Sequence, residues 1–210
     1  MAVICPTVTA FDTHDYRAQI ELLETFAERI HIDLMDGVFA PTKSPGLDQV
    51  WWPEKLMADI HLMYQYPMEE IEQLIKLRPS LVIIHFEADV NHQEFANELH
   101  NAGVKAGLAI LSDTSVESSL GVIKHYDHAL VFSGKLGYHG GTANLGLLDK
   151  VQKIKEAYPG IEIGWDGGVN DKNAKQLVDG GVTFLNVGGF IHKAPSPQEA
   201  YAKLKTLVEA

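Results

Sequence analysis

The stretch LVIIHFEADVNHQEFANELHNAGVKAGLAIL, residues 81–111, contains one complete strand–helix–strand unit. Its first part, LVIIHFE (81–87), is an almost continuous apolar run, and so is its last part, KAGLAIL (105–111). Between them, QEFANELHNAG (93–103) carries apolar residues at helical spacing and ends in glycine, as an amphipathic helix with a C-cap does. Strands that are apolar on both faces are typical of parallel sheets covered by helices.

The same unit recurs along the whole chain. Amphipathic helical patterns separate the predicted strands, although segment 36–57 is irregular and its helix is the least regular of the set. No GxGxxG motif follows the first strand, which disfavours a dinucleotide-binding open sheet. Eight repeats therefore predict an α/β fold, a single TIM (β/α)8 barrel domain spanning residues 1–210. The predicted strands cover residues 2–8, 29–35, 58–63, 81–87, 105–111, 128–134, 161–167 and 182–188.

The composition agrees with one domain and limits the partners. The chain has 210 residues, of which 46% are hydrophobic, enough for a sizeable core. Its net charge of −11 without a basic stripe argues against nucleic acid or an anionic membrane as a partner. Cys5 is the only cysteine, so no intrachain disulfide can form. Neither a signal peptide nor a membrane span is apparent, and a cytoplasmic protein is expected.

Polar residues interrupt the apolar strands near their C-terminal ends, where barrel enzymes carry their chemistry. Alternate residues of a strand share one face, so His31 and Asp33 point the same way. If that face is the barrel interior, His61 and Asp166 converge on them from two other strands. Burying two aspartates without a cation would be costly. The four side chains therefore predict one divalent ion, with Zn²⁺ as first choice and Fe²⁺, Mn²⁺ or Co²⁺ as alternatives.

Other polar residues near this cluster carry weaker signals. His85 and Glu87 repeat the histidine–acid pattern on the fourth strand, and spacing alone leaves open whether they bind metal, support the ligands or line a pocket. Asp36 points away from Asp33 and is expected to cap a turn. The remaining histidines fall mostly on helices and loops and are expected to be solvated: His14, His92, His100, His125, His128, His139 and His192.

Glycine clusters follow the last three predicted strands. They are SGKLGYHGGT (133–142), DGGVN (166–170) and NVGGF (186–190). Barrels often bind phosphate at the loops after strands seven and eight, and glycines let backbone N–H groups approach the phosphate oxygens closely. The three clusters together predict a phosphate-binding site.

The motifs HIDLMDG, DIHLM, HFEA and DGGVN, with the Pro-Thr of the first strand, resemble those of the ribulose-phosphate 3-epimerase family over essentially the whole chain. This resemblance implies a metal-dependent isomerase that inverts C3 of D-ribulose 5-phosphate to give D-xylulose 5-phosphate, a pentose phosphate pathway reaction. It implies His31, Asp33, His61 and Asp166 as metal ligands, with Asp33 and Asp166 also acting as acid/base catalysts on opposite faces of C3. Members of the family are commonly homo-oligomers, so a homo-oligomer is expected.

The resemblance also implies a set of substrate-binding residues, in which methionines wall the reacting carbons and glycine loops hold the phosphate. The chain departs from the family pattern in five places. Thr7 replaces a serine, Phe132 a methionine and Phe190 a serine, KLGYHGGT replaces the usual loop after the sixth strand, and APTKSPG (40–46) stands where an asparagine is usual. The substrate therefore stays open. The alternatives are 3-epimerisation of another ketose phosphate such as allulose 6-phosphate, or of a sugar without phosphate, and a non-catalytic sugar-phosphate-binding barrel. The implied substrate-binding residues are Thr7, Met35, Met63, Gly137, Gly140, Gly141, Gly167, Gly168, Gly189 and Phe190.

Overall fold

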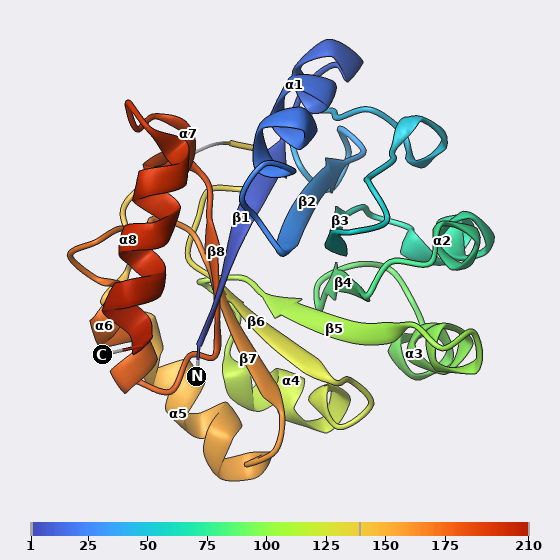
Figure 1. Ribbon diagram of the computed structural model, residues 1–210. Coiled ribbons are helices and arrows are strands. Elements are labelled where there is room, and N and C mark those ends of the chain that lie inside the picture. Colours follow the sequence, from blue (N-terminus) through green and yellow to red (C-terminus); the bar gives the residue numbers. More distant parts are fainter. Residues whose placement is uncertain (1, 139, 210) are drawn as a thin grey trace.

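Eight parallel strands close into a barrel in chain order, and the last strand pairs with the first (Figure 1). The computed structural model describes residues 2–138 and 140–209. The closed barrel with alternating helices confirms the predicted (β/α)8 fold. The strands are β1 (Val3–Thr9), β2 (Arg29–Met35), β3 (Met57–Met63), β4 (Leu81–His85), β5 (Lys105–Ile110), β6 (His128–Phe132), β7 (Glu162–Asp166) and β8 (Phe184–Val187).

Helices surround the barrel on its outside (Figure 1). The irregular segment between β2 and β3 contains only a 3-10 turn, η1 (Leu47–Gln49), and no α-helix. No helix within the described residues is long and apolar enough to cross a membrane. Two more 3-10 turns, η2 (Pro67–Glu70) and η3 (Leu145–Leu147), precede helices. The α-helices are α1 (Thr13–Leu23), α2 (Ile71–Leu77), α3 (His92–Asn101), α4 (Val116–Ile123), α5 (Leu148–Ala157), α6 (Ala174–Asp179), α7 (Gly189–His192) and α8 (Pro197–Glu209).

The unit β4–α3–β5 follows the sequence pattern closely. Helix α3 ends at Asn101, and Gly103 adopts a φ of +76°, a conformation that favours glycine. This turn lets the Val104 N–H donate to the Leu99 carbonyl at 2.9 Å, which satisfies a carbonyl at the helix end. The chain then enters β5 at Lys105. The predicted C-cap is therefore confirmed.

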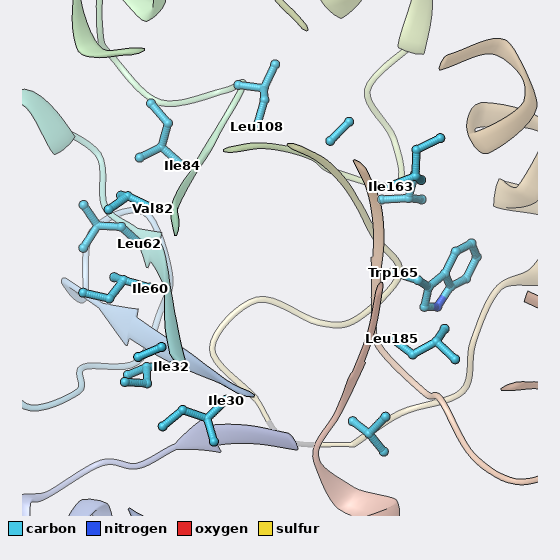
Figure 2. Close-up of a cluster of buried hydrophobic side chains, with 14 of the residues drawn as sticks. Ile30, Ile32, Ile60, Leu62, Val82, Ile84, Leu108, Ile163, Trp165 and Leu185 are labelled. Atoms are coloured by element: carbon cyan, nitrogen blue, oxygen red, sulfur yellow. The ribbon is translucent and has the colours of Figure 1, made fainter. Parts of the chain in front are cut away.

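Outward-facing strand residues form the main hydrophobic core. In Figure 2 their side chains extend away from the ring of strands toward the helices. Burial of one such aliphatic side chain contributes about 1.5–3 kcal/mol to stability. Because side chains alternate along a strand, the remaining residues face the barrel interior. The residues labelled in Figure 2 are Ile30, Ile32, Ile60, Leu62, Val82, Ile84, Leu108, Ile163, Trp165 and Leu185.

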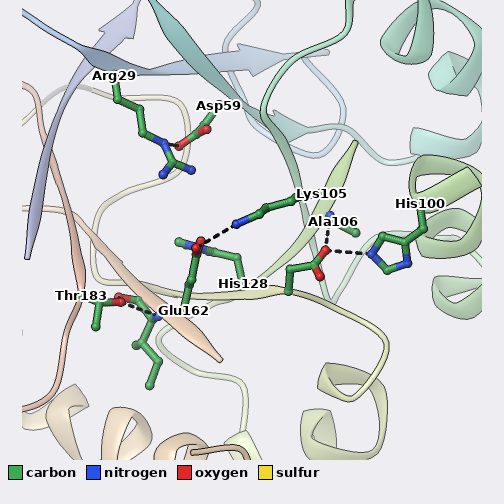
Figure 3. A network of polar contacts seen from close by, with 10 residues as sticks. Arg29, Asp59, His100, Lys105, Ala106, His128, Glu162 and Thr183 are labelled. Carbon is green, nitrogen blue, oxygen red and sulfur yellow. Dashed lines mark hydrogen bonds and ion pairs between the residues drawn. The ribbon is translucent and has the colours of Figure 1, made fainter. Parts of the chain in front are cut away.

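The barrel interior is polar where the strands begin, a region called the base here (Figure 3). Arg29 Nε donates to Asp59 Oδ2 at 2.7 Å, and Lys105 Nζ donates to Glu162 Oε1 at 2.9 Å. His128 is buried beside them, with Nδ1 3.6 Å from Glu162 Oε2. The expectation that His128 is solvated was wrong, because His128 is the first residue of β6 and its side chain faces the barrel interior.

An apolar group fills the interior on the side of β4, β5 and β6. Leu81, Ile83, Ala109 and Leu130 form a buried cluster separate from the main core. Along β6, Leu130 lies between the base and the opposite end of the barrel. That opposite end, where the strands terminate, is called the mouth here.

Candidate active site

Four side chains meet at the mouth. His31 and Asp33 come from β2, His61 from β3, and Asp166 is the last residue of β7. The register of β2 and β3 places Asp33 opposite His61. One ligand atom from each of the four lies within 4.8 Å of the others. The structure thus brings together the residues that strand alternation had selected, while their role as metal ligands stays a prediction.

The ligand atoms of this cluster face one small volume. His61 Nδ1 lies 3.0 Å from Asp33 Oδ1 and 3.7 Å from Asp166 Oδ2. His31 Nε2 lies 3.4 Å from Asp33 Oδ1 and 3.5 Å from Asp166 Oδ2. Both imidazoles are fully buried, whereas both carboxylates keep some exposure. The carboxylates can therefore touch a bound small molecule that the imidazoles cannot reach.

The two carboxylates favour a positive charge in this volume. Burial by itself would lower the pKa of His31, but Asp166 and Asp33 outweigh it and raise that pKa to about 10. Burial would likewise raise the pKa of Asp33, and the two histidines hold it below its usual range instead. A cation placed here would take over the role of the protonated His31.

The cluster fits a divalent ion. His31 Nε2 is buried, faces both carboxylates, and has no hydrogen-bond partner among the described residues. Within residues 2–138 and 140–209, neither Asp33 nor Asp166 forms an ion pair with a lysine or an arginine. Two imidazole nitrogens and two carboxylate oxygens are donors that Zn²⁺ and similar borderline ions bind.

A hydroxyl that the sequence prediction missed orients one carboxylate. Thr9 Oγ1 donates to Asp33 Oδ2 at 2.6 Å, which leaves Asp33 Oδ1 facing the two imidazoles. Thr9 is two residues after Thr7 on β1, so the two share a face. That alternation was the signal that could have found it.

His85 and Glu87 support the cluster from behind. The Nε2 atoms of His61 and His85 are 2.9 Å apart, so that one donates a hydrogen bond and the other accepts it. Burial lowers the pKa of His85 to about 4, which keeps this ring neutral and able to accept. His85 Nδ1 faces Glu87 Oε2 at 3.6 Å, and Glu87 Oε1 accepts from the Leu111 N–H and the Thr114 hydroxyl. Neither residue belongs to the four-residue cluster.

Asp36 shapes the loop that follows β2. Its Oδ1 accepts hydrogen bonds from the N–H groups of Val38 and Phe39, at 2.7 and 2.8 Å. Its Oδ2 accepts from the Gln65 N–H at 2.7 Å, which connects this loop to the chain after β3. The predicted turn-capping role is confirmed.

A cavity of about 250 Å³ opens at the mouth and extends from the carboxylates to the late loops. Met35 is not on its wall: it is fully buried beside Met63 and accepts a hydrogen bond from the Thr42 hydroxyl. The lining residues that were not predicted include Thr9, Gly134, Lys135, Tyr138, Asn170, Asn186 and Lys193. The predicted residues on the wall are Thr7, Asp33, Met63, Gly137, Gly140, Gly141, Asp166, Gly167, Gly168, Gly189 and Phe190.

Glycines pack the late loops directly against one another at this cavity. Gly167 and Gly168 have φ values of +109° and +73°. A Cβ on Gly167 would lie 2.2 Å from the backbone N of Gly134, and one on Gly168 would lie 2.1 Å from that of Ala143. Only glycine fits at these two positions, so the backbone itself forms this end of the cavity.

The prediction for His139 falls outside the described residues.

The fold is that of the (β/α)8-barrel class. A model of the ribulose-phosphate 3-epimerase family matches residues 3–192, and the chain belongs to that family. Ribulose-phosphate 3-epimerase from Schizosaccharomyces pombe is 28% identical over 99% of this chain and 94% of its own length. The enzyme of that name from Mycobacterium tuberculosis H37Rv is 31% identical over 85% of this chain and 81% of its own.

The family makes this chain an isomerase, which disfavours a non-catalytic barrel. Solved structures with the same fold are much more distant in sequence. A 3-keto-L-gulonate-6-phosphate decarboxylase from Vibrio cholerae has a TM-score of 0.75 at 9% identity, covering 99% of this chain and 97% of its own. A 3-hexulose-6-phosphate synthase has a TM-score of 0.72 at 15% identity, covering 98% and 99%. At these identities the likeness concerns the fold alone.

Proposed function

We propose that the protein is a metal-dependent 3-epimerase that converts D-ribulose 5-phosphate to D-xylulose 5-phosphate. One observation carries the proposal: Asp33 and Asp166 reach the same small volume from strands on different sides of the barrel, with His31 and His61 behind them. Inverting a carbon centre requires a proton to leave from one face and another to arrive at the opposite face. Two opposed carboxylates supply this pair of groups. Membership of the family supports the choice of substrate.

In the proposed reaction, one aspartate removes the C3 proton and becomes a carboxylic acid. The electron pair of the C3–H bond forms the C2=C3 double bond, and the C2 carbonyl oxygen gains the negative charge of an enediolate. The other aspartate, already protonated, then donates its proton to the opposite face of C3, and the carbonyl re-forms. Thr9 holds Asp33 in place through a hydrogen bond to Oδ2. We assign Asp33 to one face and Asp166 to the other.

His31, Asp33, His61 and Asp166 would hold the divalent ion, with Zn²⁺ as first choice and Fe²⁺, Mn²⁺ or Co²⁺ as alternatives. When bound, the ion supplies Lewis-acid stabilisation of the negative charge that develops on the substrate oxygens. The fully buried imidazoles keep their positions between the strands and contact no substrate. Membership of the family is the basis on which we also propose a cytoplasmic homo-oligomer acting in the pentose phosphate pathway.

The phosphate of the substrate would bind at the glycine-lined end of the cavity. Gly140, Gly141, Gly167 and Gly168 line that end, and Gly167 and Gly168 pack the chain backbone-to-backbone against neighbouring loops. Exposed backbone N–H groups in such loops bind phosphate oxygens. A second candidate is 3-epimerisation of another ketose phosphate such as allulose 6-phosphate, because Phe190 on the cavity wall replaces the serine of the family pattern.

The test is turnover of a panel of ketose phosphates in ²H₂O by purified protein, before and after chelation and metal restoration. We expect deuterium at C3 of ribulose 5-phosphate, loss of exchange on chelation, and recovery with one of the four ions. Faster turnover of a hexulose phosphate would favour the second candidate. Full exchange at C3 in protein shown to be metal-free would contradict the metal-dependent scheme.

A further inference from the structure

Lys193 lines the same cavity as Asp33 and Asp166. The residue is exposed and directly follows the short helix α7. A Cβ on Gly140 would lie 3.7 Å from Lys193 Nζ, and a Cβ on Gly189 would lie 4.0 Å from Lys193 Cε. The ammonium therefore lies beside both the loop after β6 and the loop after β8.

No carboxylate of the described residues neutralises this ammonium. Within residues 2–138 and 140–209, Lys193 forms no ion pair, whereas Lys105 at the base is paired with Glu162 at 2.9 Å. Lys135, the other cation on the cavity wall, lies over the Tyr138 ring at 4.4 Å from its centre. In a chain with a net charge of −11, an unpaired ammonium on a cavity wall is a specific attraction for an anion.

The rest of this end of the cavity offers hydrogen bonds but little charge. Glycine backbone can donate N–H groups to a phosphate, yet it carries no net positive charge. Phe190 lines the cavity with an aromatic ring, which has no group to donate to a phosphate oxygen. A phosphate dianion leaving water needs charge-assisted partners, and Lys193 is positioned to supply one.

We propose that Lys193 is the residue by which this chain selects a phosphorylated substrate, pairing its ammonium with a phosphate dianion held beside Gly140 and Gly189. The inference rests on the proposed function and deepens it. The phosphate of ribulose 5-phosphate is on C5 and takes no part in the proton transfers at C3, so the pairing has the same strength in the bound substrate and in the transition state. Lys193 therefore lowers KM and leaves kcat unchanged.

The test compares Lys193→Met with Lys193→Arg, and with Lys172→Met, a lysine outside the cavity wall. For Lys193→Met we expect KM for ribulose 5-phosphate to rise about 10- to 100-fold, the range for one charge-assisted hydrogen bond, with kcat within threefold of the wild type. The Kd of inorganic phosphate, measured by calorimetry, should rise by a similar factor. Lys193→Arg should recover most of both effects, and Lys172→Met should show neither.

The calorimetric arm separates this inference from the proposed function. If the wild type turns over no ketose phosphate, the proposed function fails, while weaker phosphate binding by Lys193→Met still supports the phosphate contact. An unchanged Kd for phosphate in Lys193→Met overturns the inference, as does the absence of phosphate binding by the wild type. A fall in kcat without a rise in KM also overturns it, because that result assigns Lys193 to the chemical step.

Discussion

The base and the mouth of the barrel interior both contain carboxylates and histidines, but the charges of the carboxylates are balanced differently at the two places. At the base, Asp59 is paired with Arg29 and Glu162 with Lys105, so each carboxylate has a cation from the chain itself. At the mouth, the ionisable partners of Asp33 and Asp166 among the described residues are imidazoles, and neither carboxylate is paired with a lysine or an arginine. The carboxylates at the base are neutralised within the chain, whereas those at the mouth keep negative charge that a bound cation can balance.

The histidines at the two ends carry this difference in their protonation. Burial dominates for His128 at the base and lowers its pKa, although the neighbouring Glu162 acts in the other direction. At the mouth, the carboxylates of Asp166 and Asp33 overcome the same burial and raise the pKa of His31 to about 10. An inward-facing histidine therefore indicates a functional centre only where carboxylates without their own cations surround it.

The largest expected effect comes from neutralising the mouth. Asp33→Asn and Asp166→Asn should each lower kcat for epimerisation by about 10²- to 10⁴-fold, because an amide cannot take up the C3 proton. Their free energy of unfolding in metal-free protein should fall by less than that of Asp59→Asn. Steady-state kinetics and urea unfolding measure the two quantities. Near-normal turnover by either variant would rule out the two-base scheme.

The same chemical change at the base should act on stability instead. Asp59→Asn leaves the largely buried Arg29 without its partner and should lower the free energy of unfolding by about 3 kcal/mol. The kcat/KM should stay within twofold of the wild type, because Asp59 does not line the cavity. Urea unfolding and kinetics on one preparation check both. A large loss of activity in folded Asp59→Asn would show that the two ends are coupled.

A third substitution probes the support behind the mouth. His85→Leu removes the partner of His61 Nε2 and should weaken metal binding about 10- to 100-fold, since a hydrogen bond to the other ring nitrogen fixes the orientation of a ligating imidazole. Competition with a chromophoric chelator measures this affinity, and the visible spectrum of the Co²⁺-loaded protein reports the ligand geometry. His85→Gln, which keeps an acceptor, is the matched control. Equal affinities for His85→Leu and the wild type would mean that His61 needs no such support.

The smallest effect is a difference in acid stability at the base. The pKa of Glu162 falls from 4.5 to about 2, because His128 and Lys105 lower it by more than burial raises it. As the pH falls, the Glu162 carboxylate is therefore protonated in the unfolded chain before it is protonated in the folded chain. Its contribution to the free energy of unfolding is complete above pH 4.5 and is lost as the pH falls toward 2. Glu162→Gln should cost about 1 kcal/mol near neutral pH and nothing near pH 2. Urea unfolding of this variant across that pH range tests the prediction, with Glu98→Gln, at an exposed position of α3, as the control. A difference in unfolding free energy between Glu162→Gln and the wild type that does not change with pH would contradict it.

The sequence predicted the barrel and the four-residue cluster because both depend on simple periodicity. Alternation along β2 and β3 selects His31, Asp33 and His61 without any knowledge of loops. Thr9 was missed because a hydroxyl in an apolar strand carries no charge that marks it as unusual. Glu87 was ambiguous because β4 ends at His85, and strand ends are set by local hydrogen bonding.

The periodicity of the sequence also did not predict how deeply a side chain is buried or which path a loop takes. Met35 shares the inward face as expected, but the loop after β2 covers it through Thr42, so that it does not reach the cavity wall. Lys193 belongs to no periodic element facing the interior, and only the folded loops bring its ammonium to the cavity. The segment between β2 and β3 lacks an α-helix for a similar reason, since scattered prolines and glycines interrupt any helical pattern.

The glycine contacts between the late loops have a consequence for how this enzyme can change. Because Gly167 and Gly168 fit directly against the backbones of neighbouring loops, larger residues there would force those loops apart. Specificity can then change only through the other side chains on the cavity wall, such as the cationic Lys135 and Lys193 and the aromatic Phe190. New substrate preferences in this barrel should therefore arise from substitutions of cavity-wall side chains, while the glycine backbone of the late loops stays unchanged.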